Sequence, residues 1–254
     1  MSQRVLITGG ASGIGLGLAL RFAAEGARVA LCDADGGAVA RAASQMPDAI
    51  ARQADVTDAA QMDAFLGEVE NAWGGIDVVC ANAGTGGPAG RIEDLDYDAW
   101  QACLAVNLNG AFLTCRWAAR IMRAQGAGTI IITSSTSGQW GHPYRAPYAA
   151  AKWGLVGLTK TLAMELGPVG VRVNAICPGA VEGERMDRVV AMEAKASMRP
   201  EAEVRDQYVR GVSMRTWVTV DDLADTVLFL ASPAASKISG QIIAIDGHTE
   251  TNAP

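Results

Sequence analysis

The residues best suited to chemistry lie in the stretch SSTSGQWGHPYRAPYAAAK, from Ser134 to Lys152. Within it Tyr148 precedes Lys152 by four residues and follows Ser135 by thirteen. Residues four apart share one face of an α-helix, so a helix beginning near Pro147 would hold the phenol beside the ammonium group. A fixed positive charge favours the phenolate and lowers the tyrosine pKa from about 10 toward the range that suits general acid–base catalysis.

Ser135 ends the apolar run GTIIITSS, which is typical of a buried strand, so its hydroxyl could face the same space as the phenol. For an isolated tyrosine and lysine four residues apart, an ordinary pair on a helix surface is the usual explanation. The choice between a catalytic pair and a surface pair therefore depends on what the rest of the chain places around Tyr148.

Strand-like and helix-like segments alternate through the whole chain. Short apolar, β-branched runs predict strands, and the segments between them mostly have the period of a helix. The predicted strands are 5–8, 27–33, 49–56, 76–84, 128–135, 171–176 and 241–247. This alternation predicts one domain, residues 1–254, of the α/β class: a Rossmann-like, doubly wound, parallel seven-stranded sheet with helices on both faces.

A glycine-rich turn follows the first predicted strand, with Gly9, Gly13 and Gly15 in the pattern T-G-x-x-x-G-x-G. At a strand-to-helix turn, a pyrophosphate can approach the backbone and the free N–H groups of the helix start. Asp33 ends the second predicted strand, where a carboxylate can bind the adenosine ribose and repel a 2′-phosphate. No arginine or lysine occurs in residues 9–15 or 32–40, where it could bind a 2′-phosphate, so we expect NAD rather than NADP. The alternative for Asp33 is an ordinary solvated aspartate in a turn.

Further polar residues follow the other predicted strands. The third is expected to end at Asp55 and Val56, and the fourth runs into Asn82 and Gly84. Such residues commonly cap turns, but they can also line a ligand crevice at the carboxyl edge of a parallel sheet. Asn107 belongs to an N-L-N-G interruption of a long helical segment, where we expect a kink with free backbone groups. Their collection at one sheet edge favours a common binding site.

From residue 180 to about 216 the composition becomes charged and rich in methionine. We expect this segment to be a mobile helical lid over the site, because functional insertions often follow strands. A solvated amphipathic hairpin is the alternative. The next segment, 218–232, predicts an amphipathic helix with Thr219 as its N-cap.

The composition argues against several classes of protein. The net charge is −6 with a pI near 5.0 and no basic block, so nucleic acid is not the expected partner. Apolar runs are too short to cross a bilayer and no secretory signal is visible, which favours a cytoplasmic protein. The five cysteines and two histidines are dispersed, so we expect reduced thiols and no metal site.

Taken together, the motifs resemble the classical short-chain dehydrogenase/reductase (SDR) family over essentially the whole chain. The matching motifs are TGGASGIG (8–15), ADVT (54–57), NAG (82–84), Asn107, Ser135, YAAAK (148–152) and NAICPG (174–179). The resemblance implies that Tyr148 exchanges a proton with the substrate oxygen, which Ser135 polarises. It also implies that Lys152 lowers the tyrosine pKa and holds the nicotinamide ribose, while Asn107 holds a water that relays protons through Lys152.

The resemblance further implies a nicotinamide dinucleotide site. Asp55 and Val56 would flank the adenine, and Asn82 and Gly84 the inner ribose region. The other implied cofactor contacts are Gly9, Ser12, Gly13, Ile14, Gly15, Asp33, Tyr148, Lys152, Pro178, Gly179 and Val181. One departure is Gly183, where many members place a threonine that binds the nicotinamide amide. Backbone groups, or Glu182 or Glu184, would have to replace it.

Substrate contacts are expected from the loop before the tyrosine and from the lid: Gln139, Trp140, His142, Arg145, Arg185 and Arg188. This set is too polar for a steroid or lipid pocket. We expect a small polar substrate, such as a polyol, a sugar acid or another hydroxy acid, with any charge held by an arginine fork. Each arginine taken singly could also be an ordinary surface residue.

The sequence therefore predicts an NAD-dependent oxidoreductase that interconverts a secondary alcohol and a ketone. One alternative is a 3-oxoacyl-thioester reductase, which usually favours NADPH. Another is a non-catalytic NAD-binding subunit, against which the complete set of four catalytic residues argues. The resemblance alone implies a homotetramer, or a dimer, and helix 148–168 is rich enough in Ala, Gly and Leu to form an apolar interface.

Overall fold

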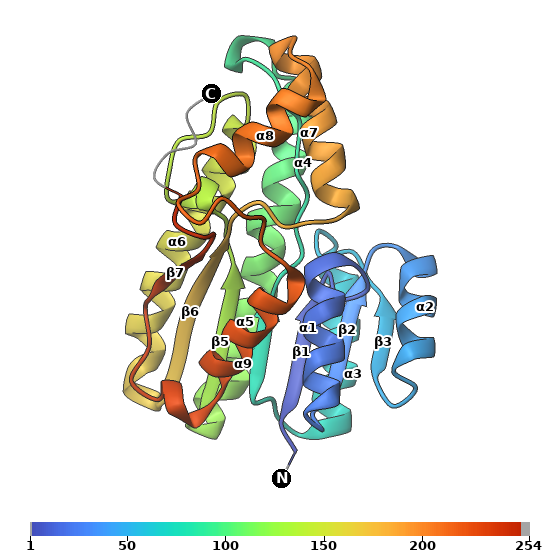
Figure 1. Ribbon diagram of the computed structural model, residues 1–254. Helices are drawn as coiled ribbons and strands as arrows, with labels where there is room; N and C mark the ends of the chain where they lie inside the picture. Colours follow the sequence, from blue (N-terminus) through green and yellow to red (C-terminus); the bar gives the residue numbers. More distant parts are fainter. Residues whose placement is uncertain (1, 250–254) are drawn as a thin grey trace.

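The computed structural model describes residues 2–249, which form a central parallel sheet covered by helices on both faces (Figure 1). The sheet has seven strands in the order β3-β2-β1-β4-β5-β6-β7. Their bounds are Arg4–Thr8 (β1), Arg28–Asp33 (β2), Ile50–Gln53 (β3), Val78–Ala81 (β4), Gly128–Thr133 (β5), Val171–Pro178 (β6) and Ile242–Ile245 (β7). The strand order reverses between β1 and β4, where a doubly wound sheet forms its ligand crevice. The predicted fold class is confirmed.

The helices are α1 to α9. Their bounds are Gly13–Ala24, Gly36–Gln45, Ala59–Trp73, Tyr97–Leu104, Gly110–Gln125, Ala146–Leu166, Glu184–Ser197, Glu201–Arg210 and Val220–Ala231. Side chains alternate across each strand, so one strand supplies both cores. Val5 and Ile7 of β1 pack with α1, α2 and α9, whereas Leu6 packs with α3, α5 and α6. Both faces of the sheet are therefore buried, as a parallel sheet requires.

Several strands end at other residues than predicted, because a strand continues only where a neighbouring strand provides hydrogen-bond partners. β3 ends at Gln53, where its pairing with β2 stops at Asp33, so Asp55 and Val56 lie in the following loop. β4 ends at Ala81 and β5 at Thr133, earlier than expected. In contrast β6 continues through Pro178, because β7 pairs with it as far as the Pro178–Ile245 register.

The expected interruption of the long helix is present, but it is a π-helical turn rather than a simple kink. Residues Ala105–Asn109 form this turn between α4 and α5. The side-chain amide of Asn107 donates to the carbonyl oxygens of Cys103 at 2.9 Å and Thr85 at 3.0 Å. Turns of this kind are frequent at functional sites.

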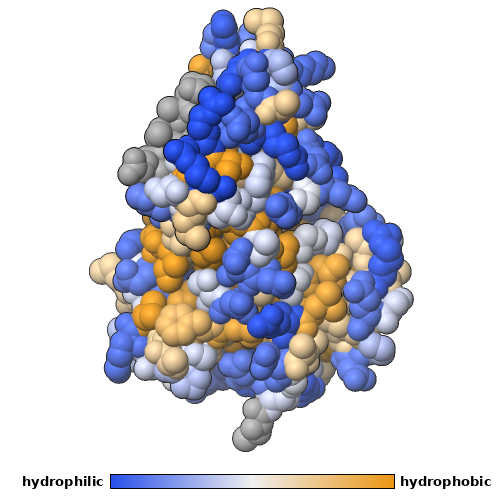
Figure 2. Space-filling view, in the orientation of Figure 1, coloured by the Kyte–Doolittle hydropathy of each residue, from blue (hydrophilic) through white to orange (hydrophobic). Residues whose placement is uncertain are grey.

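The charged segment after β6 folds into α7 and α8, which stand above the carboxyl edge of the sheet (Figure 1). They share a small apolar cluster of Val190, Ala194 and Val204. On the face shown in Figure 2, the surface over these helices is predominantly hydrophilic. The helical content of this segment agrees with the prediction, while its mobility stays a prediction. Thr219 caps α9 in a capping box with Asp222, as expected.

No helix within residues 2–249 combines the length and the apolar character needed to cross a membrane.

Candidate active site

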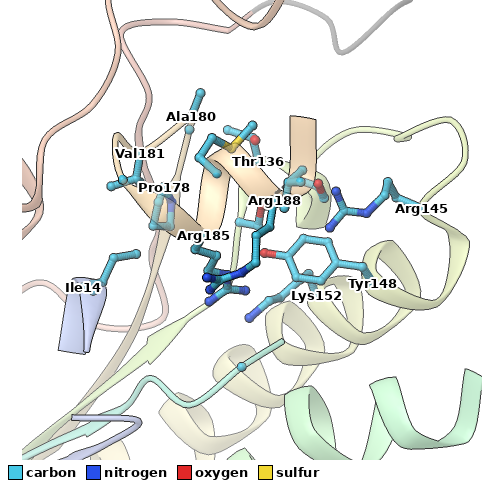
Figure 3. Close-up of a pocket in the computed structure, with 18 of the residues that line it drawn as sticks. Ile14, Thr136, Arg145, Tyr148, Lys152, Pro178, Ala180, Val181, Arg185 and Arg188 are labelled. Atoms are coloured by element: carbon cyan, nitrogen blue, oxygen red, sulfur yellow. Dashed lines mark hydrogen bonds between the residues drawn. The ribbon is translucent and has the colours of Figure 1, made fainter. Parts of the chain in front are cut away.

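A cavity of about 1330 Å³ opens at the carboxyl edge of the sheet and extends beneath α7 and α8. It brings together most of the residues singled out from the sequence. These are Gly9, Ser12, Gly13, Ile14, Gly15, Asp33, Asp55, Val56, Asn82, Gly84, Ser135, His142, Arg145, Tyr148, Lys152, Pro178, Gly179, Val181, Arg185 and Arg188. Residues from the first glycine turn and from the α7 region, far apart in the chain, thus share one site (Figure 3).

Two predicted substrate residues lie elsewhere. After Ser135 the chain makes a short 3₁₀ turn at Thr136–Gly138, and Gln139 and Trp140 then line a separate, open surface pocket with Trp153. The Trp140 side chain is 43% exposed. The structure therefore does not bring these two residues into the large cavity, and their contact with a substrate stays a prediction.

Helix α6 positions Tyr148 and Lys152 as the spacing predicts. Lys152 is almost completely buried, its Nζ donates to the carbonyl oxygen of Thr133 at 2.8 Å, and this nitrogen lies 5.4 Å from the centroid of the Tyr148 ring. The carbonyl oxygen comes from the end of β5, so the sheet edge holds the ammonium group beside the phenol (Figure 3). A surface pair is excluded by this burial.

Several groups act on the pKa of Tyr148. Burial alone would raise it, but the positive charge of Lys152, then that of Arg185, a hydrogen bond with Ser135 and the charge of Arg145 together hold it below the usual value. The pKa of Lys152 is also lowered, chiefly by burial, although the neighbouring phenol opposes this shift. The site therefore stabilises the Tyr148 phenolate relative to that of an ordinary tyrosine. The base form is present at lower pH than it would be for a tyrosine in water.

Asn107 is fully buried below the cavity floor and supplies an acceptor. Its Oδ1 has no hydrogen-bond partner among residues 2–249. A Cβ placed on Gly84 would lie 2.8 Å from this oxygen and 3.5 Å from Nζ of Lys152, so the two groups border the same small space. Buried unpaired acceptors are rare and usually have a function. The arrangement suits a path that passes protons away from Lys152.

The glycine turn fits a dinucleotide because its backbone is tightly folded and its outer surface is open. A Cβ on Gly15 would lie 2.0 Å from the carbonyl oxygen of Gly9, whereas a Cβ on Gly13 would meet no atom within 4 Å. Gly9 and Gly13 have φ values of +60° and +49°, which L-residues with side chains rarely adopt. The Ser12 side chain does not cap α1, so N–H groups at this helix start remain available to an anion.

Asp33 and Asn82 fix the two sides of this turn. The Asp33 carboxylate accepts hydrogen bonds from the backbone N–H groups of Ala11 and Asp35, each at 3.2 Å. The Asn82 amide donates to the carbonyl oxygens of Thr8 and Gly9 at 3.2 and 3.3 Å. These contacts connect the turn to the ends of β1, β2 and β4. The residues present are therefore suited to a nicotinamide dinucleotide.

The position of the family's threonine also has an unusual backbone. Gly183 precedes α7 with a φ of +132°, and a Cβ there would meet no atom within 4 Å. This conformation strains any residue with a side chain. The glycine is thus required by the chain path, and Glu182 and Glu184 on either side line the cavity.

Sequence analysis did not identify Glu193 of α7, which lines the cavity. We call Glu193, Arg145, His142 and Tyr208 the Glu193 cluster. Arg145 Nη1 donates to Glu193 Oε1 at 2.7 Å, and the Tyr208 hydroxyl donates to Oε2 at 2.6 Å. His142 Nε2 lies 3.4 Å from Oε1. Glu193 is only 9% exposed, and no periodic pattern in a charged helix indicates such burial of a glutamate.

The Glu193 cluster connects α7 and α8 to the N-terminal end of α6. Burial would raise the pKa of Glu193, but hydrogen bonds from His142 and Tyr208 and the charges of His142 and Arg145 hold it below its usual value. The carboxylate, in turn, raises the pKa of Tyr208 together with burial. Arg145 also donates to the carbonyl oxygen of Gly86 at 2.9 Å. Glu193 is therefore an anion that neutralises Arg145.

Metal chemistry finds no support within the described part of the chain. No three His, Cys, Asp or Glu residues of 2–249 are grouped to hold a metal ion. The five cysteines are buried, and none forms a disulfide within residues 2–249.

Comparisons with known proteins show the family to which the chain belongs. A family model described as Enoyl-(Acyl carrier protein) reductase matches residues 9–248. Levodione reductase of Leifsonia aquatica is 35% identical over 96% of this chain and 92% of its own. The 2-(S)-hydroxypropyl-CoM dehydrogenase 3 of Xanthobacter autotrophicus is 37% identical over 97% and 96%. A crystal structure of NAD⁺-bound xylitol dehydrogenase, 31% identical, matches with a TM-score of 0.92 over 97% and 98% of the two chains.

The match along nearly the full length, the parallel sheet and the grouped tyrosine, lysine and glycine turn lead to one conclusion: this chain belongs to the short-chain dehydrogenase/reductase family of oxidoreductases.

Proposed function

We propose that the protein is an NAD-dependent oxidoreductase that interconverts a secondary alcohol and a ketone on a small polar substrate. The observation that carries this proposal is the buried Lys152 ammonium beside Tyr148, whose pKa lies below the usual value of a tyrosine. The relatives named above are a reductase and dehydrogenases, which supports the general reaction.

The residues that would hold the dinucleotide are the turn from Gly9 to Gly15, Asp33 and the residues after β4 and β6. A bound oxidised nicotinamide supplies the acceptor for the hydride that leaves the alcohol carbon. The protein's part is to orient the substrate and to manage the proton and the charge. Asp33 carries the preference for NAD, because its carboxylate would repel the additional phosphate of NADP.

Tyr148 would act as the base in alcohol oxidation and as the acid in ketone reduction. As the C–O bond becomes a carbonyl, the hydroxyl proton passes to the phenolate, and in the reverse direction the phenol returns it. The Ser135 hydroxyl is placed to hold the substrate oxygen beside the phenol. The space between Lys152 and Oδ1 of Asn107 offers the proton an exit from the buried site.

One alternative is reduction of a 3-oxoacyl thioester. The description of the matching family model, an acyl carrier protein reductase, favours this candidate. It predicts a preference for NADPH and turnover of acyl thioesters. A non-catalytic NAD-binding subunit is the other alternative, and it predicts cofactor binding without turnover.

Assembly and location are proposals as well. A cytoplasmic homotetramer, or dimer, is supported by large apolar side chains that are exposed on α5 and α6, among them Phe112, Trp153 and Met164. Light scattering coupled to gel filtration tests the assembly, and a monomer at micromolar concentration would contradict it. Fractionation of the source cells tests the location.

The function is tested by following NADH or NADPH absorbance with the purified protein. Polyols, sugar acids, hydroxy acids and 3-hydroxyacyl thioesters are offered with NAD and NADP in parallel. We expect oxidation of a polar secondary alcohol with NAD, and loss of about 10²- to 10⁴-fold in kcat for Tyr148→Phe with NAD affinity retained. A preference for thioesters with NADP would favour the first alternative, and cofactor binding without any turnover would favour the second.

A further inference from the structure

Of the arginines that line the cavity, Arg185, an exposed residue of α7, has no acidic partner within residues 2–249. Five arginines line the cavity, and four of them have an acidic partner. The pair of Arg145 with Glu193 is buried, whereas the pairs of Arg188 with Glu184, Arg199 with Glu203 and Arg210 with Asp206 are partly or largely exposed and hold their arginines only weakly. For Arg185, residues 2–249 supply no ion pair and no side-chain hydrogen bond. Glu182 and Glu184 also line the cavity, but they are exposed and neither forms an ion pair with Arg185.

This unbalanced charge lies at the reactive end of the cavity. Figure 3 shows the Arg185 side chain descending from α7 toward the hydroxyl of Tyr148 and the ammonium group of Lys152. Its positive charge is also one of the influences that lower the pKa of Tyr148 and of Lys152. Lys152 donates to the Thr133 carbonyl oxygen and is expected to hold the cofactor, so among residues 2–249 Arg185 is the cavity-lining cation without an acidic partner that can face the substrate.

The other arginine near the phenol is not available in this way. Arg145 is 2% exposed, and its guanidinium group is divided between Glu193 at 2.7 Å and the Gly86 carbonyl oxygen at 2.9 Å. Its Nε is buried and has no hydrogen-bond partner within 2–249, while its Cζ lies 4.9 Å from the Tyr148 ring centroid. Arg145 therefore forms part of the wall, with its net charge neutralised by Glu193.

We propose that Arg185 binds a carboxylate of the substrate, so that the preferred substrates are hydroxy acids and the matching oxo acids rather than neutral polyols. This inference rests on the proposed function and narrows its substrate class. An arginine binds a carboxylate through two parallel hydrogen bonds, which would fix the orientation of the neighbouring alcohol carbon. A neutral polyol would leave the guanidinium charge uncompensated when α7 covers the site, so the same residue selects against it.

The oxidation is balanced without any group beyond those already proposed. The hydroxy acid loses a hydride from its alcohol carbon to NAD⁺ and the hydroxyl proton to the Tyr148 phenolate, which gives the oxo acid, NADH and a proton released to solvent. The carboxylate is unchanged and serves only in recognition. An oxo acid is reduced by the reverse process.

The test compares acids with neutral alcohols of the same carbon skeleton. The pairs are 2-hydroxybutyrate and 1,2-butanediol, 3-hydroxybutyrate and 1,3-butanediol, and gluconate and sorbitol. For the wild-type protein we expect a higher kcat/KM for at least one acid than for its neutral partner. Arg185→Gln should lower kcat/KM for that acid by about 10- to 100-fold, mostly through KM, and lower kcat/KM for the neutral alcohol much less, with each variant compared at the pH of its maximal rate so that a shift of the Tyr148 pKa does not enter. Arg185→Lys should recover part of the loss.

Arg205→Gln is the matched control, because Arg205 lies on α8 outside the cavity and pairs with Asp187 at 2.7 Å. We expect this variant to retain the acid preference. NAD affinity is measured by calorimetry for each variant. Arg185→Gln should bind NAD as the wild type does, and a selective loss of NAD affinity would assign Arg185 to the cofactor and overturn the proposal.

The remaining outcomes separate this inference from the function on which it rests. Equal or better turnover of the neutral alcohols, with Arg185→Gln unchanged, would overturn the carboxylate site while the alcohol dehydrogenase assignment stands. No turnover of any alcohol or oxo acid with either cofactor would overturn the proposed function, and the inference with it.

Discussion

Nη1 of Arg145 donates a 2.7 Å hydrogen bond to Oε1 of Glu193, and this ion pair joins the N-terminal end of α6 to α7. Both side chains are nearly inaccessible to water, so the pair is not an ordinary surface contact. The neutralisation of Arg145 changes how the cavity recognises charge. It is the reason that we assign Arg185, whose side chain lies near Tyr148 (Figure 3), to the proposed recognition of the substrate.

We expect Glu193→Gln to lower the free energy of unfolding by about 3 kcal/mol, because it leaves the buried Arg145 charge without a counterion. Chemical denaturation measures this change. Asp187→Asn is the matched control, since its ion pair with Arg205 is half exposed, and it should cost less than about 1 kcal/mol. Equal effects of the two substitutions would show that burial of the Glu193 pair has no energetic consequence.

The oxidation rate should rise with pH as Tyr148 loses its proton. Removing a nearby positive charge disfavours the phenolate, so Lys152→Met should raise the Tyr148 pKa and move this rise to higher pH. Arg185→Gln should shift it in the same direction by a smaller amount, because the influence of Lys152 is the larger. The pH profile of kcat/KM for a neutral alcohol measures both shifts. A midpoint unchanged in Lys152→Met would mean that another group titrates, and Arg205→Gln should leave the profile in place.

Gly15→Ala should disrupt the cofactor turn, since its Cβ would lie 2.0 Å from the Gly9 carbonyl oxygen. We expect a loss of about 1–3 kcal/mol in stability and weaker NAD binding. Gly67→Ala in the middle of α3 is the matched control, because its Cβ would meet no atom within 4 Å and alanine favours the helix by about 0.5–1 kcal/mol. Thermal unfolding and NAD titration of both variants test the pair. A Gly15→Ala protein with normal NAD affinity would argue against a tight turn around the cofactor.

Asp33→Ala should weaken the preference for NAD over NADP, because it removes the carboxylate that repels a 2′-phosphate. The measurement is the ratio of kcat/KM values for the two cofactors, which we expect to move toward NADP by at least about tenfold. Asp48→Ala, at an exposed turn outside the cavity, should leave the ratio unchanged. If Asp33→Ala also leaves it unchanged, another residue reads the ribose.

Local spacing was sufficient for much of this protein. The alternation of apolar runs and helical periods predicted the parallel sheet, because each pattern depends only on neighbours along the chain. The positions of Tyr148 and Lys152 on one face of α6 follow from helix geometry alone. The glycine turn and the Thr219 cap were predictable for the same reason, since their conformations are set by a few consecutive residues.

The tertiary structure decided which side chains meet across the cavity. Strand ends depend on the neighbouring strand, so β3 stops at Gln53 although its apolar pattern continues. Gln139 and Trp140 share a loop with Ser135, yet one turn of chain sends them to another surface.

The ion pair of Arg145 with Glu193 is the clearest contact that could not be predicted from the sequence. Glu193 and Arg145 are 48 residues apart, and no local pattern connects an acid of a charged helix to an arginine before another helix. Their pairing exists because α7 folds back over the carboxyl edge of the sheet and excludes water from both side chains. The sequence by itself determined the spacing of Tyr148 and Lys152 and the glycine turn, while the packing of α7 decided that Arg145 is paired with a buried carboxylate and that Arg185 is not.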